Sequence, residues 1–85
     1  MKTLNRNFLK FLTKEIKKNE VYISRKREIG DIKFVEITHI QTKSVYPVYN
    51  EYCQYSDFLC NVSGEKQNLS LIFRIFSNGI FEWVA

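Results

Sequence analysis

The lysines and arginines of the first 27 residues are the side chains whose type and spacing best suit a chemical task. This stretch holds nine Lys or Arg and two Glu, a net charge of +7, whereas residues 28–85 hold four basic and seven acidic residues, a net charge of −3. Clustered cations bind the phosphates of nucleic acids without reading the base sequence. We therefore expect RNA as a partner, held by its phosphate backbone with little sequence preference. The expected phosphate contacts are Arg6, Lys10, Lys14, Lys17, Lys18, Arg25, Lys26 and Arg27.

Other readings of the same charge stay open. A solvated basic face would keep a small protein soluble, and an acidic protein would be attracted by the same cations. A membrane is not expected as a partner, because one basic helix without a lipid anchor binds a membrane surface only weakly.

Catalytic and metal-binding motifs are not found in the sequence. His39 is the single histidine, and with Cys53 and Cys60 it offers at most three ligands at no recognised zinc spacing. We therefore expect no metal, no cofactor and no enzymatic activity. The alternative is a small endoribonuclease in which His39 acts as a general acid or base together with Arg and Lys.

Tyrosines could add a second kind of contact with nucleic acid. Tyr22 precedes the Arg25–Arg27 run, and residues 46, 49, 52 and 55 are tyrosines at every third position. Exposed rings stack on unpaired bases, whereas buried rings close the edge of a core or an interface. The sequence leaves both roles open.

The N-terminal segment from Leu4 to Lys18 is predicted to be a helix that presents the first of these cations. At about 100° per residue its apolar residues fall on one arc and its basic residues on the opposite arc. Thr3 is the expected N-cap, and Asn19 is expected to adopt a left-handed conformation after the last turn. Glu15 falls near the apolar arc, so we expect it at the edge of the core, paired with a basic group.

Residues 20–40 are predicted to form a β-hairpin. Gly30-Asp31 between two isoleucines suits a type II′ turn. The resulting register would place Glu28 opposite Lys33 and Arg25 opposite Glu36, two pairs of opposite charge. Residues 44–57 are expected to be loop and irregular strand.

The C-terminal third is predicted to form strands at 58–63, 69–76 and 80–84. A turn at Gly64–Gln67 and an Asn78-Gly79 turn of type I′ would connect them. With a two-residue loop at Asn78-Gly79, Arg74 lies opposite Trp83. One face of this hairpin then carries Ile72, Phe76, Phe81 and Trp83. One helix cannot cover both faces of a sheet, so we expect these four residues to form a homodimer interface.

Together these patterns predict one α+β domain over residues 1–85, with an N-terminal amphipathic helix packed on a four- to five-stranded antiparallel sheet. Lys10 and Lys14 interrupt the apolar run that a signal peptide would need, and no run is long enough to span a membrane. A cytoplasmic location with reduced cysteines is therefore expected.

The chain is short, opens with NRNFLKFLTKEIKK and ends with SNGIFEWVA. In this character it resembles small phage-encoded anti-defence proteins and is similar to the TifA type of antagonist of toxin-antitoxin ribonucleases. The resemblance implies a non-enzymatic inhibitor that engages RNA and a host protein in the host cytoplasm. The alternatives are a protein-interaction module without nucleic acid and the His39 endoribonuclease.

Overall fold

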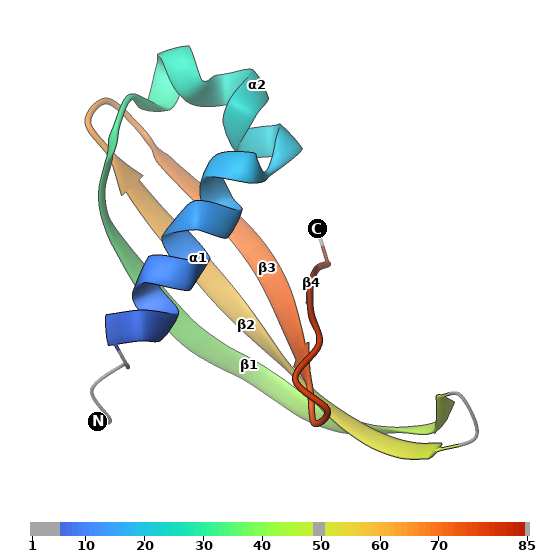
Figure 1. Ribbon diagram of the computed structural model, residues 1–85. Coiled ribbons are helices and arrows are strands. Elements are labelled where there is room, and N and C mark those ends of the chain that lie inside the picture. Colours follow the sequence, from blue (N-terminus) through green and yellow to red (C-terminus); the bar gives the residue numbers. More distant parts are fainter. Residues whose placement is uncertain (1–5, 49–50, 85) are drawn as a thin grey trace. The chain divides into compact units, whose positions relative to one another are not determined.

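The computed structural model describes residues 6–48 and 51–84, and the side chains of 6–44 and 54–84. Two helices, α1 (Arg6–Lys18) and α2 (Glu20–Ile29), precede four strands, β1 (Ile32–Val48), β2 (Glu51–Gly64), β3 (Asn68–Phe76) and β4 (Phe81–Trp83) (Figure 1). The strands form one antiparallel sheet in the order β1-β2-β3-β4. The predicted α+β class is confirmed.

The chain divides into two compact units. The helical unit comprises Met1–Val35 and Val62–Leu69, and the sheet unit comprises Glu36–Asn61 and Ser70–Ala85. The helical unit thus contains both helices, the start of β1 and the β2–β3 turn. The sheet unit contains most of the strand residues.

Helix α1 follows the predicted apolar and basic arcs, except that Phe11, expected on the apolar arc, is 42 % exposed. Leu12 and Ile16 are fully buried, and Phe8 and Leu9 are partly buried. Glu15 is partly buried, with a carboxylate oxygen 3.7 Å from the Lys18 ammonium, which confirms its predicted pairing with a basic group. The expected cap at Thr3 lies outside the described residues.

Helix α2 replaces the strand predicted at residues 20–28, so the predicted hairpin is wrong. Asn19 is extended (φ −69°, ψ 130°) rather than left-handed, and its Oδ1 accepts a hydrogen bond from the Val21 amide at 2.9 Å. An asparagine in this position caps the start of a helix. Gly30 ends the helix with φ 80°, and its amide donates to the Lys26 carbonyl at 2.8 Å.

The β2–β3 turn closes the C-terminal end of α2. The Gly64 amide donates to the Gln67 carbonyl at 3.0 Å, which confirms the predicted turn. The Lys66 amide donates to the carbonyl of Ile29, at the last turn of α2, at 2.9 Å. A Cβ on Gly64 would overlap the side chain and carbonyl of Ile29. The close approach of turn and helix therefore requires glycine at this position.

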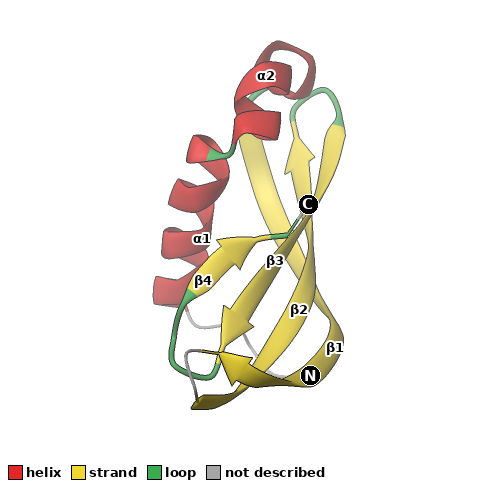
Figure 2. Cartoon of the chain, turned by 90° about the vertical axis from the view of Figure 1, so that its right-hand side faces the viewer, coloured by secondary structure: helices red, strands yellow, loops and turns green. Residues whose placement is uncertain are grey.

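In the sheet unit, the β3–β4 register differs by one residue from the prediction. β4 runs beside β3 (Figure 2). Phe73 lies opposite Trp83, Arg74 opposite Glu82 and Ile75 opposite Phe81. The loop has three residues, Ser77-Asn78-Gly79, closed by the Phe76 amide donating to the Ile80 carbonyl at 2.9 Å. Gly79 has φ 92°, as a three-residue hairpin loop with a left-handed last residue requires.

This register moves Phe81 and Trp83 to the opposite face of the hairpin, because side chains alternate along a strand. Both rings contact the fully buried Phe73, with centroids 5.3 Å and 6.2 Å away. The predicted grouping of Ile72, Phe76, Phe81 and Trp83 on one face is therefore wrong. The homodimer stays a prediction, but the four residues proposed as its interface do not share one face of the hairpin.

Residues 44–57 are expected from sequence to be loop and irregular strand; the described positions are all strand, so the loop part of this prediction is wrong. β1 continues through Val48 and β2 begins at Glu51. Valine and tyrosine favour a pleated strand, and that preference prevailed over the lack of clear alternation. The side chains of Tyr46, Tyr49, Tyr52 and Cys53 lie outside the described residues.

Candidate nucleic-acid interface

Helix α1 carries five of the eight predicted phosphate contacts along one exposed stripe. Arg6, Lys10, Lys14, Lys17 and Lys18 are all exposed and, at 100° per residue, span an arc of roughly 120°. The helix turns Leu12 and Ile16 inward, which fixes the direction of this stripe. The apolar burial of α1 therefore presents the cations to solvent.

Helix α2 adds Arg25, Lys26 and Arg27. Lys26 and Arg27 are exposed. Arg25 is less exposed, because its Nε lies 3.4 Å from Glu28 Oε2 and its Nη2 donates to Gln67 Oε1 at 3.2 Å. All eight cations lie in the helical unit, and we call them the basic surface.

Six of these cations make no ion pair within the described part of the chain. Lys18 contacts Glu15 and Arg25 contacts Glu28, whereas the other six have no described carboxylate within 4.0 Å. The six are Arg6, Lys10, Lys14, Lys17, Lys26 and Arg27. Their charge is not neutralised by a described neighbour and is free to attract an anion.

Two adjoining cavities lie within the helical unit. The first, of about 400 Å³, is the interhelical cleft, lined by Thr13, Lys17, Tyr22, Ile23, Lys26, Asp31 and Ile32. The second, of about 490 Å³, lies between α2 and the β2–β3 turn and shares Ile23, Lys26 and Asp31 with the cleft. Sequence reasoning missed both cavities, because it assigned residues 20–28 to a strand.

Tyr22 does not serve as a stacking platform. The residue is 3 % exposed, and its hydroxyl donates to the Gly30 carbonyl at 3.2 Å. Burial raises the pKa of Tyr22, with the nearby Asp31 carboxylate adding to the shift. The Tyr55 ring already makes a cation–π contact within the chain, because the Arg74 guanidinium lies 3.9 Å from the centre of the ring.

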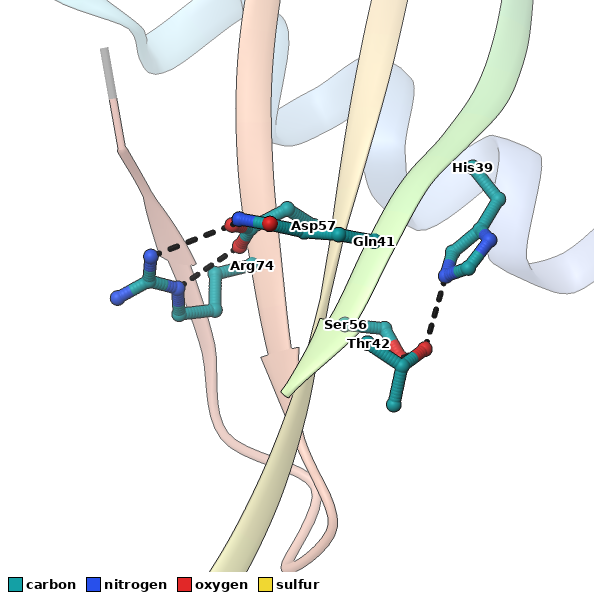
Figure 3. A network of polar contacts seen from close by, with 6 residues as sticks. All are labelled: His39, Gln41, Thr42, Ser56, Asp57 and Arg74. Carbon is teal, nitrogen blue, oxygen red and sulfur yellow. Dashed lines mark hydrogen bonds and ion pairs between the residues drawn. The ribbon is translucent and has the colours of Figure 1, made fainter. Parts of the chain in front are cut away.

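His39 lies in the sheet unit, away from any described Arg or Lys contact. Its Nε2 is 2.9 Å from Thr42 Oγ1, which in turn is 2.9 Å from Ser56 Oγ (Figure 3). Its ring centroid lies 5.4 Å from that of Phe58. Among the described residues, the contacts of His39 are therefore with a hydroxyl group and an aromatic ring.

A second polar network joins Asp57, Arg74 and Gln41, and Figure 3 shows it directed away from His39 and Thr42. Arg74 Nε donates to Asp57 Oδ1 at 2.8 Å and Nη2 to Oδ2 at 3.3 Å, while Gln41 Nε2 donates to Oδ2 at 2.9 Å. Hydrogen bonds from Arg74 hold the pKa of the 4 % exposed Asp57 below its usual value, against the effect of burial. The same pair raises the pKa of Arg74.

This network was missed from sequence. The one signal for it in the sequence is the Gly64–Gln67 turn. If Gly64 pairs with Gln67, the same antiparallel register along β2 and β3 places Asp57 directly across from Arg74. The network holds Arg74 in place, so this cation is not added to the basic surface.

The remaining features bear on the predicted absence of a metal and of a membrane span. Within the described residues, no group of three His, Cys, Asp or Glu side chains could hold a metal ion. Helices in that part of the chain are too short and too polar to cross a membrane. Cys60 is fully buried, and burial raises the pKa of its thiol to about 11.

Comparison with known proteins gave no match to a protein-family model, and no significant match to a curated protein or to a solved structure.

Proposed function

We propose that this chain is a non-enzymatic RNA-binding protein that holds the phosphate backbone on the basic surface of α1 and α2. One observation carries the proposal: six exposed cations on two consecutive helices have no described acidic partner within 4.0 Å. Such a surface neutralises phosphates and releases their counterions, which gives binding with little sequence preference.

The decisive experiment compares two charge-matched double variants. Lys10→Glu with Lys14→Glu reverses two cations of the basic surface, whereas Lys33→Glu with Lys43→Glu reverses two exposed cations of β1. Both change the net charge by the same amount. The affinity for several unrelated single-stranded RNAs is measured by fluorescence anisotropy between 50 and 200 mM salt.

We expect the α1 variant to bind every RNA more weakly and its salt slope to fall by roughly 1.4, about 0.7 for each phosphate that is no longer neutralised. The β1 variant should retain most of the binding. Equal weakening in the two variants would show that net charge alone attracts the RNA and that the basic surface is not the interface.

A second candidate is a protein-interaction module without nucleic acid. It is favoured by the apolar side chains that the sheet unit exposes, since Ile40, Ile80 and Val84 are 49 %, 50 % and 43 % exposed. The inhibitor role implied by the resemblance combines both candidates, because it requires RNA and a host protein.

Capture of host proteins by the immobilised chain, with and without ribonuclease treatment, separates these roles. Partners released by ribonuclease are held through RNA, and partners retained are held by protein contacts. Incubation of the chain with labelled RNA tests the third alternative, because cleavage by wild type but not by His39→Ala would identify a ribonuclease.

A further inference from the structure

The interhelical cleft has the dimensions of a small-ligand site. Its volume of about 400 Å³ lies within the range of roughly 300 to 1,000 Å³ that is typical of such sites. Its walls come from α1, from α2 and from the first residues after Gly30. The cleft therefore opens directly within the basic surface.

Two cations from different helices line the cleft. Lys17 belongs to α1 and Lys26 to α2, and neither makes an ion pair with a described carboxylate. Both are members of the basic surface. A phosphate bound between them would be held from two sides.

The rest of the lining suits a flat ring that carries N–H groups. Ile23 is 57 % exposed and, with Ile32, supplies an apolar wall. Asp31 is exposed and forms no ion pair with a described cation. An ionised carboxylate only accepts hydrogen bonds, so the ligand must present donors to it.

Among the RNA bases, guanine matches this acceptor best. Its Watson–Crick edge carries two adjacent donors, N1–H and the N2 amino group, which can pair with both oxygens of a carboxylate. Uracil offers one N–H between two carbonyl oxygens, and these would be repelled by Asp31. The two bases should therefore differ in affinity.

We propose that the interhelical cleft binds one unpaired guanine nucleotide of RNA. Its phosphate lies between Lys17 and Lys26, its ring lies against Ile23, and N1–H and N2–H donate to the Asp31 carboxylate. The neighbouring cavity, lined by Arg27 and Lys66, receives the adjoining backbone. This inference rests on the proposed function, to which it adds a preferred nucleotide.

The test uses two fluorescent eight-nucleotide RNAs, one all uridine and one with a single central guanosine. Wild type should bind the guanosine RNA about tenfold more tightly, as one bidentate base contact provides. Asp31→Asn should reduce this ratio to near one while retaining affinity for the uridine RNA. The backbone groups of Asp31, not its carboxylate, bond Glu65, so the variant should fold.

Glu20→Gln is the matched control, because it removes one carboxylate of α2 that does not line the cleft. It should keep the tenfold preference. Equal affinity of wild type for both RNAs would overturn the cleft proposal and leave the proposed function intact. A preference that survives in Asp31→Asn would also overturn it. Failure to bind either RNA would overturn both proposals.

Discussion

Arg74 donates two hydrogen bonds to Asp57, from Nε to Oδ1 at 2.8 Å and from Nη2 to Oδ2 at 3.3 Å. The Asp57 side chain is 6 % exposed and that of Arg74 is 25 % exposed, so the pair is largely removed from water. Paired carboxylates at such depth stabilise a fold only while both partners are present. The pair links neighbouring strands β2 and β3 of the sheet unit.

Replacing Arg74 with Met should destabilise the protein by about 2 kcal/mol, because Asp57 is left buried with a single donor, Gln41. Thermal unfolding measures the change. Arg25→Met is the control, since its pair with Glu28 is 40 % and 61 % exposed and should contribute under about 0.5 kcal/mol. Similar destabilisation in the two variants would contradict a special role for the buried pair.

Acid should weaken the fold through the same carboxylate. The pKa of Asp57 is lower in the folded than in the unfolded chain, where it is about 3.9. Ionised Asp57 therefore contributes its full stabilisation at pH values above its unfolded-state pKa. This stabilisation is lost as the pH falls toward its folded-state pKa. Urea unfolding between pH 6 and pH 3 should show a smaller loss of stability in Asp57→Asn than in wild type. Identical pH profiles would exclude this carboxylate as a source of acid sensitivity.

Removing the cap of α2 should cost about 1 kcal/mol. In Asn19→Ala the Val21 amide loses its 2.9 Å acceptor at the first turn of the helix. Asn19→Asp retains an oxygen at the same place and should be close to wild type. The melting temperature of the alanine variant should fall by roughly 4 to 8 °C. An unchanged melting temperature in Asn19→Ala would contradict the role of Asn19 as the N-cap of helix α2.

The observed β3–β4 register gives Phe81 a packing role. Phe81→Ala removes a ring that is stacked on Phe73 at 5.3 Å and meets Trp83 edge-on at 5.2 Å, so the free energy of unfolding should fall by about 2 kcal/mol. Ile80→Ala, at a 50 % exposed neighbour, should change it by under about 0.5 kcal/mol. A larger loss in Ile80→Ala than in Phe81→Ala would favour the two-residue loop.

The predicted homodimer is tested separately, by light scattering on the wild-type protein.

The two glycines of the hairpin turns should respond differently to alanine. Gly79 has φ 92° with open space around it, so Gly79→Ala should cost about 1 to 2 kcal/mol from the backbone alone. Gly64→Ala should cost more, because the new Cβ overlaps Ile29 at the end of α2. Denaturant midpoints compare the two. Equal midpoints would mean that the β2–β3 turn does not pack closely on α2.

The sequence by itself determined the features that depend on neighbouring residues. Apolar residues recur at helical spacing through α1, and the same spacing sets Lys10 and Lys14 on the solvent side. The Gly64–Gln67 turn was also predicted correctly, because polar residues and a glycine separate two apolar strand patterns there. The concentration of positive charge is a property of composition alone and needs no fold.

Tertiary structure decided the cases in which local signals fit two arrangements. Residues 20–28 alternate well enough for a strand, and Asn19 fits either end of a helix; the contacts of Ile29 with Gly64 and Lys66 are the tertiary ones that go with a helix here. Asn78-Gly79 fits loops of two or three residues, and the packing of Phe81 and Trp83 on Phe73 goes with the longer loop. The Asp57–Arg74 pair follows from the β2–β3 turn once its register is extended along the two strands. The interhelical cleft arises from the choice of a helix at residues 20–28 and joins residues distant in sequence, which local patterns do not encode.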